Sequence, residues 1–198
     1  HQTDQLDIGF ANVNPNRDDD KSGLNYLAAA GVVFLAIISL NRELRNRDFF
    51  KNSSSDWDLL QFVPLVAMAT IADVVPLRKL NRALVKQGLI LYARYNNYGI
   101  NSILGQKSSI SDISYQDIGY LIGPMINAGG RMGRSYLGFE LLTSDTASIA
   151  DQITDELKAL NEARKSKEQY CLELAIQEYE NNLKKDSIIA LELDALHI

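Results

Sequence analysis

The sequence has 198 residues, of which 46% are hydrophobic and 23% charged, a composition that fits a globular protein and excludes a largely disordered one. Its single cysteine, Cys171, excludes an internal disulfide framework and is typical of a reducing cytoplasm. The formal net charge of −5 argues against nonspecific attraction to nucleic acid over the whole surface, but it is compatible with a local basic groove.

The first elements along the chain predict a strand and then a buried helix. Residues 8–13 form a short apolar run that ends at the turn signal Asn14-Pro15-Asn16. Residues 26–45 predict a helix that is apolar nearly all round, so we expect other elements to cover it on several sides. The uncharged run at 25–41 is shorter in its apolar part than the roughly 20 residues of a membrane-spanning helix, and no membrane contact is expected.

The middle of the chain predicts several helices and one glycine-rich loop. A helix over residues 58–71 places Asp73 at its C-terminal end, and Pro76 prevents the helix from continuing. The other predicted segments are an amphipathic helix at 80–95, a short helix at 99–104, a capped helical turn at 114–122 and a glycine-rich loop at 123–133.

The C-terminal part predicts a short helix and then a long charged one. The short helix covers residues 136–142, and residues 145–183 follow as one long helix or a pair of helices. Apolar side chains recur there at a helical spacing, at Ile149, Ile153, Leu157 and Leu160. Residues 188–193 are typical of a strand that begins a further domain, and we expect both ends of the chain to be cut from a longer protein.

Asp73 is the most informative single residue, and it supports two interpretations. It stands between the apolar segments 69–72 and 74–77, where a buried carboxylate without a partner would be costly. Coordination of a divalent cation would supply that partner, because hard cations prefer anionic oxygen ligands. The alternative is an aspartate that caps the next helix or accepts hydrogen bonds from nearby backbone amides.

The glycine-rich segment 123–133 is a candidate anion site, because it combines four glycines with Asn127 and Arg131. Glycines allow backbone amides to approach an anion closely, and a guanidinium binds phosphate through two hydrogen bonds. The alternative is a structural connection in which the arginine forms a salt bridge.

Three basic residues, Lys79, Arg82 and Lys86, share one face of the helix that follows Asp73. They are candidates for a track that binds phosphates, although such a stripe is more often an ordinary solvated face. The two histidines, His1 and His197, have no neighbour at a spacing typical of metal ligands.

Two motifs together resemble the RecJ single-strand DNA exonucleases of the DHH phosphoesterase superfamily. Residues 71–77 (Ile-Ala-Asp-Val-Val-Pro-Leu), followed by Asn81-Arg82 and Gly88-Leu89, are similar to the fourth RecJ motif. Residues 123–133 (Gly-Pro-Met-Ile-Asn-Ala-Gly-Gly-Arg-Met-Gly) are similar to the fifth. Further segments match the family in order, namely 13–16, 28–34 and 156–161.

The resemblance implies a two-metal site that binds Mn²⁺ or Mg²⁺. His1 stands where the second histidine of the Asp-His-His motif would fall, so His1 and Asp73 are the expected catalytic and metal-binding residues. The missing preceding motifs would supply the other ligands. The residues expected to bind phosphate are Arg82, Asn127, Gly129, Gly130 and Arg131. Met125 replaces the family's usual arginine and Gly129 its usual alanine.

The fold implied is α/β. Residues 1–144 would be the C-terminal, helix-rich part of a doubly wound parallel-sheet DHH domain. Residues 145–185 would be a long connecting helix, and residues 186–198 the truncated start of a second domain of the DHHA1 type.

The function implied is metal-dependent hydrolysis of single-stranded DNA from the 5′ end, in DNA repair and recombination. Single-stranded DNA is the implied partner, and a single-strand-binding protein and a helicase are compatible further partners. Two alternatives stay open. One is a DHH phosphodiesterase of short oligonucleotides or cyclic dinucleotides. The other is a non-catalytic remnant, split half or nucleic-acid-binding scaffold, because we expect the 198 residues alone to have no appreciable nuclease activity.

Overall fold

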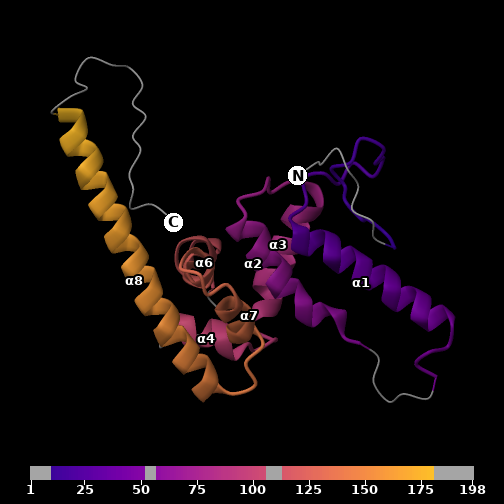
Figure 1. Cartoon of the computed structure of the whole chain (residues 1–198). Helices are drawn as coiled ribbons and strands as arrows, with labels where there is room; N and C mark the ends of the chain where they lie inside the picture. The colour runs from indigo at the N-terminus through magenta and orange to yellow at the C-terminus, as the bar shows by residue number, and fades with distance from the viewer. Residues whose placement is uncertain (1–9, 52–56, 106–112, 181–198) are drawn as a thin grey trace. The chain divides into compact units, whose positions relative to one another are not determined.

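The computed structural model describes residues 10–51, 57–105 and 113–180, and every regular element in these residues is a helix (Figure 1). The described residues divide into two compact units. The first unit contains those up to residue 96 together with 113–123, and the second contains residues 97–105 and 124–180.

Helix α2 is the centre of the first unit, because α1, η1, α3 and η3 all contact it. It has no charged residue, and its Pro64 lies in the first turn, where a missing N–H leaves no helical hydrogen bond unmade. The helical segments described in this unit are α1 (Ala29–Asn46), the 3₁₀ turn η1 (Leu59–Phe62), α2 (Val63–Ala72), α3 (Lys79–Tyr92), α5 (Tyr115–Asp117) and the π-helical segment η3 (Ile118–Ile122).

Helices α2 and α3 approach each other closely at Gly88. A Cβ atom on Gly88 would lie only 2.4 Å from Cβ of Ala67 and 2.9 Å from the carbonyl oxygen of Val63. Beside this contact, a cluster of buried apolar side chains joins α1, α2 and α3; it consists of Phe34, Val63, Val66 and Leu91. The glycine therefore sets the distance at which the core of the first unit packs.

Helix α1 is less covered than its composition predicts. Only Gly31, Phe34 and Asn41 are buried, whereas Val33 and Leu40 are 57% and 51% exposed. Among the described residues, α1 packs mainly on α2, so the expectation of cover on several sides is wrong for this part of the chain. A helix that is apolar all round indicates burial, but it does not indicate which elements supply the cover.

The second unit is built on the long helix α8. Helices α4 and α7 both contact α8 and also contact each other. The helices of this unit are α4 (Tyr98–Leu104), α6 (Gly123–Arg131, from Pro124 on), α7 (Tyr136–Leu142) and α8 (Ala147–Glu178). The predicted helices near 58–71, 80–95, 99–104, 136–142 and 145–183 are thus confirmed within a few residues at most boundaries.

The buried face of α8 differs from the predicted apolar stripe. Leu157 is fully buried as expected, but Ile149 is 47% exposed. The residues that are buried in this part of the helix are Ala150, Thr154, Leu157 and Asn161. Two polar residues therefore lie on the packed face, which apolar periodicity alone does not detect.

Residues 123–131 form a helix, so the predicted glycine-rich loop is wrong. The π-helical segment η3 runs directly into α6, and the Gly123 N–H donates to the carbonyl oxygen of Ile118, five residues back. Pro124 lies in the first turn of α6, where proline is tolerated. The helix ends before Gly133, whose φ of +77° is in the left-handed region that favours glycine.

The sheet implied by the resemblance is not seen in the described residues, which contain helices but no strand. Of the predicted strand at 8–13, residues 10–13 have no regular secondary structure and residues 8 and 9 lie outside the described residues. The predicted strand at 188–193 also lies outside them.

None of the described helices combines the length and apolar character that a membrane-spanning segment requires.

We predict that Gly88→Ala destabilises the protein, because its new methyl group would overlap Ala67 and the backbone of Val63. Overpacking of this kind costs about 1–3 kcal/mol. Gly31→Ala is the matched control, because a Cβ on Gly31 would meet its nearest neighbour, Leu27, at an ordinary 3.6 Å. Thermal unfolding measures both variants, and equal melting temperatures for the two would contradict the close approach of α2 and α3.

Candidate functional site

Asp73 lies at the C-terminal end of α2, with an exposed side chain. Its N–H donates to the carbonyl oxygen of Ala69 at 2.9 Å, which closes the last helical turn. No partner for its carboxylate is found among the described residues. The expectation of a buried carboxylate is therefore wrong here, and so is the capping alternative, because Arg78 is the N-cap residue of α3.

The position of this carboxylate opposes helix stability. A negative charge at the C-terminus of a helix faces the negative end of the helix dipole, at a cost of about 0.3–1 kcal/mol. With no compensating hydrogen bond in the described residues, Asp73 gives α2 no evident structural benefit. An exposed carboxylate in this state is free to bind a cation.

The turn that follows Asp73 is strained at both ends. Val74 has a φ of 53° and Lys79 a φ of 45°, both in the left-handed region. A β-branched residue is rarely found there, and each such residue costs about 1–3 kcal/mol. Val74 is also 86% exposed, so apolar burial does not offset this cost within the described residues. We call residues 73–79 the Asp73 turn.

Asn81 holds the Asp73 turn in place. Its side-chain amide is fully buried and donates to the carbonyl oxygens of Pro76 at 3.0 Å and Tyr26 at 2.8 Å. The Arg78 guanidinium lies 5.1 Å from the centre of the Tyr26 ring, a favourable cation–π distance. The turn is thus joined both to the start of α3 and to the segment before α1.

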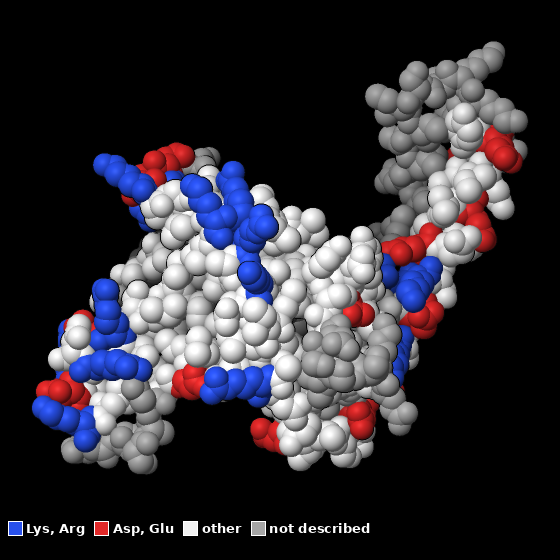
Figure 2. Space-filling model, turned by 180° about the vertical axis from the view of Figure 1, so that it is seen from behind, with Lys and Arg blue, Asp and Glu red and all other residues white. Residues whose placement is uncertain are grey.

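Arg82 lies one residue after this anchor, on the exposed face of α3. Lys79 and Lys86 are exposed on the same helix. Figure 2 shows a group of basic side chains over this helix, whose sequence contains no acidic residue. The Asp73 turn and Arg82 both belong to the first unit.

The predicted phosphate-binding residues of the second unit lie on α6. Asn127, Gly130 and Arg131 are all exposed, and their spacing of i, i+3 and i+4 places them on one helix face. No side-chain partner for Arg131 is found among the described residues. This face therefore offers an amide, a guanidinium and an unobstructed backbone to a ligand.

Gly129 and Met125 do not belong to this exposed face, because both are buried. A Cβ on Gly129 would lie 2.7 Å from the carbonyl oxygen of Arg134 and 3.2 Å from Cδ2 of Leu157. The glycine at this position allows close packing within the second unit. Met125 replaces the arginine of the family motif with a core side chain.

Arg134, which the sequence analysis did not single out, fixes the chain after α6. Its N–H donates to the carbonyl oxygen of Gly129 at 2.7 Å, and its guanidinium donates to the hydroxyl of Tyr136 at 2.9 Å and pairs with Glu156 of α8. The hydrogen bond with Tyr136, and then the charge of Glu156, raise the pKa of Arg134. The segment at 156–161 that resembles the family was the available signal for this pairing.

The structure groups the predicted site residues into two sets. Asp73 and Arg82 belong to the first unit, and Asn127, Gly130 and Arg131 belong to the second. His1 lies outside the described residues. No group of three or more histidine, cysteine, aspartate or glutamate side chains that could hold a metal ion occurs in the described part of the chain.

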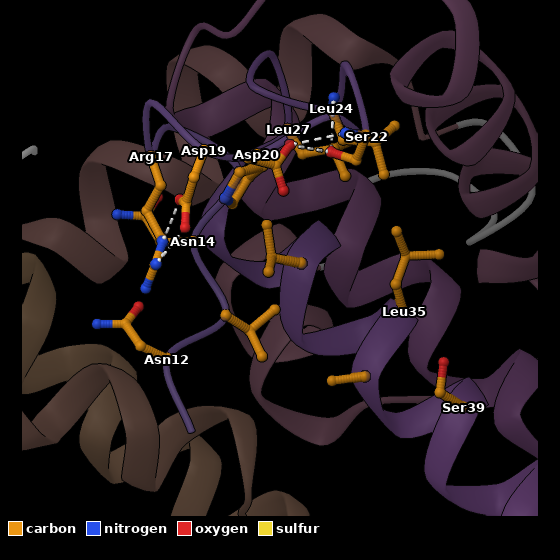
Figure 3. Close-up of a pocket in the computed structure, with 14 residues that line it drawn as sticks. Asn12, Asn14, Arg17, Asp19, Asp20, Ser22, Leu24, Leu27, Leu35 and Ser39 are labelled. Atoms are coloured by element: carbon orange, nitrogen blue, oxygen red, sulfur yellow. Dashed lines mark hydrogen bonds and ion pairs between the residues drawn. The ribbon is translucent and has the colours of Figure 1, made fainter. Parts of the chain in front are cut away.

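A pocket of about 660 Å³ lies between the loop before α1 and one side of α1 (Figure 3). Arg17 borders it, but both Nε and Nη2 of this guanidinium donate to Asp19, at 2.8 and 2.6 Å. The bond from Arg17 also holds the pKa of the Asp19 carboxyl below its ordinary value. The guanidinium that borders the pocket is thus already paired with a carboxylate.

Comparison with known proteins identifies relatives for most of the chain. No family model matches it. RecJ from Salmonella typhimurium, a single-stranded-DNA-specific exonuclease, is 35% identical over 169 residues, and RecJ from Escherichia coli is 34% identical over 169. Both alignments cover 84% of this chain. Over most of its length, this chain is thus similar in sequence to RecJ proteins. It spans about 29% of the length of these two relatives.

Solved RecJ structures have a similar fold. RecJ from Thermus thermophilus in complex with Mg²⁺ has a TM-score of 0.61 and 29% identity, over 82% of this chain and 24% of that one. An exonuclease RecJ bound to manganese also has a TM-score of 0.61, with 30% identity over 75% of this chain and 35% of that one. The resemblance of this chain to RecJ proteins, which the two motifs suggested, is therefore confirmed.

We predict that Asn81→Asp destabilises the protein more than Asn81→Leu. Leucine leaves the buried carbonyl oxygen of Tyr26 without a donor, a loss of about 1–3 kcal/mol, whereas that of Pro76 still accepts from the Arg78 N–H at 2.9 Å. Aspartate adds a buried carboxylate that faces those same two oxygens, so its folded-state pKa is raised and the penalty decreases as the pH falls through that pKa.

Thermal unfolding between pH 5 and pH 8 measures this difference, and Asn12→Asp is the matched control because Asn12 is exposed. A loss of stability for Asn81→Asp no larger than that for Asn12→Asp would contradict the role of Asn81.

Proposed function

We propose that this chain forms part of a metal-dependent exonuclease that hydrolyses single-stranded DNA from the 5′ end. The observation that carries the proposal is the Asp73 carboxylate. It is exposed, it has no partner among the described residues, and it lies on a strained turn inside a RecJ-like motif. Backbone strain at a motif is typical of functional sites. The RecJ relatives are named single-stranded-DNA-specific exonucleases, which gives the substrate class.

Asp73 would act as a metal ligand. Its anionic oxygen suits Mn²⁺ or Mg²⁺, the ions present in the solved RecJ structures. His1 is the second expected ligand in this sequence, and the remaining ligands would come from residues outside those described. When bound, the metal pair lowers the pKa of a water molecule and stabilises negative charge on the phosphate under attack.

The α6 face would hold a phosphate of the strand. Arg131 would bind two phosphate oxygens through its guanidinium, and the Asn127 amide would donate to a third. Gly130 has no neighbour within 4 Å of where its Cβ would lie, so a phosphate can approach the helix backbone there. The Arg134 contacts with Gly129, Tyr136 and Glu156 would keep this face rigid.

Arg82 would bind a second phosphate from α3. Gly129 is retained in the proposal only as a packing residue, since its Cβ position is already occupied by neighbouring atoms. Specificity for a single strand would come from backbone charge and groove shape and not from base reading.

Several parts of the proposal rest on the RecJ resemblance alone. They are the doubly wound parallel sheet, the domain division at residues 144 and 185, the roles in repair and recombination, and the cytoplasmic location. A single-strand-binding protein and a helicase as partners also rest on it. We further propose that the 198 residues alone are inactive, since no three potential metal ligands lie close together in the described part of the chain.

We predict that Asp73→Asn in the full-length natural protein lowers the rate of Mn²⁺-dependent DNA degradation by more than about 100-fold. The substitution keeps the size of the side chain and removes the charge that the metal needs. Because it also removes a negative charge from a helix C-terminus, the melting temperature should stay the same or rise.

The assay uses single strands labelled at the 5′ or the 3′ end, with the duplex of the same sequence beside them. Asp18→Asn, another exposed aspartate without a partner among the described residues, is the matched control and should keep full activity. Activity of Asp73→Asn within a few-fold of the unaltered protein would contradict the metal role. Cleavage of dinucleotides but not of long strands would assign the protein to small substrates.

A further inference from the structure

The charges of this protein are unevenly distributed along the chain. Residues 74–139, which contain most of both RecJ-like motifs, have eight basic and only two acidic residues, while the whole chain has a net charge of −5. From Val74 to Ser111 there are six basic residues and no acidic one. The part of the sequence around the candidate site is therefore strongly positive in an otherwise acidic protein.

On α3 these charges form one exposed stripe. Lys79, Arg82 and Lys86 are separated by three and then four residues, which places them within roughly 60° of one another around the helix axis. All three are exposed. We call them the α3 basic face.

The α3 basic face differs from the other charged helices in lacking acidic partners. At the end of α1, Glu43 pairs with Arg47, the residue that follows the helix. In α8, Lys158 pairs with Asp155 and Lys165 pairs with Glu162. These pairs, at i,i+3 or i,i+4, are typical of a solvated helix surface. For the side chains of the α3 basic face, no ion pair or hydrogen bond is found among the described residues. Three adjacent cations without a counter-charge repel one another, and an anionic ligand would relieve that repulsion.

The dimensions of this face fit a nucleic acid strand. The seven helical steps from Lys79 to Lys86 rise about 10 Å. This is the length of about three nucleotides of a stacked strand at roughly 3.4 Å each. The face begins at Lys79, the last residue of the Asp73 turn, and continues along α3.

We propose that the α3 basic face binds the phosphodiester backbone of the single strand next to the Asp73 turn, as a track of about three phosphates. This inference rests on the proposed function and extends it, because it assigns Lys79 and Lys86 to substrate binding. The contact is with backbone charge, so it is independent of base sequence.

The test is the salt dependence of DNA binding by the double variant Lys79→Gln/Lys86→Gln. Binding of a fluorescein-labelled 20-nucleotide oligo(dT) to the full-length protein is measured by anisotropy between 50 and 200 mM KCl, with EDTA present to prevent cleavage. For single strands, the slope of log K against log salt changes by about 0.7 for each phosphate contact. Loss of two contacts should therefore make the slope shallower by about 1.4.

The matched control is Lys158→Gln/Lys165→Gln, which removes the same charge from α8, where both lysines have acidic partners. It should leave the slope unchanged. A slope for Lys79→Gln/Lys86→Gln equal to that of the unaltered protein, or an equal change in the control, would overturn the track. An equal change on duplex of the same length would overturn its assignment to single strands.

Mn²⁺-dependent hydrolysis by the unaltered protein separates this inference from the proposed function. If the protein degrades single strands and the slope does not change, the track is wrong and the exonuclease proposal stands. If the protein neither binds nor degrades single strands, both are wrong.

Discussion

The two hydrogen bonds of the buried Asn81 amide are the constraint on which the rest of the candidate site depends. They join the carbonyl of Pro76, inside the Asp73 turn, to the carbonyl of Tyr26, 55 residues before Asn81 in the chain. An amide that donates to both carbonyls can offset backbone strain at Val74 and Lys79, because breaking the bond to Tyr26 would leave that buried acceptor unpaired. The exposed carboxylate of Asp73 and the first cation of the α3 basic face both follow from the geometry of this turn.

Close backbone packing is the second constraint, and it explains Gly88 as well as Gly129, which the resemblance first suggested for phosphate binding. Gly88 brings α3 against α2, and Gly129 brings α6 against the chain around Arg134. Gly130 differs from both, because its surroundings are open. Adjacent glycines in one motif thus have different surroundings: Gly129 is required by packing, and the space beside Gly130 is open.

The positions of α2, α3, α7 and α8 agree with the predicted helices. In α3 and α8 the signal is the helical spacing of apolar and polar residues, and in α2 it is a nearly continuous apolar run. The sequence also indicated Asp73, Asn127 and Arg131 as site candidates through the motifs, although Asp73 was expected to be buried and is exposed. It failed at residues 123–131, where glycine content suggested a loop although Pro124 and the following residues are compatible with a helix. It did not reveal the roles of Asn81 and Arg134, because their partners are distant in sequence or belong to the backbone. It also misjudged the cover of α1 and the buried face of α8, since both depend on which elements pack there and on buried polar residues such as Thr154.

Asp73 is the proposed metal ligand, and the position of a bound ion tests that role most directly. The measurement is the anomalous X-ray scattering of Mn²⁺ in crystals of the full-length natural protein, with Asp73→Asn crystals soaked in the same way. We predict an anomalous peak about 2.1 Å from an oxygen of the Asp73 carboxylate, and its weakening or loss in Asp73→Asn. Manganese bound elsewhere, with the same peaks in both crystals, would contradict the account.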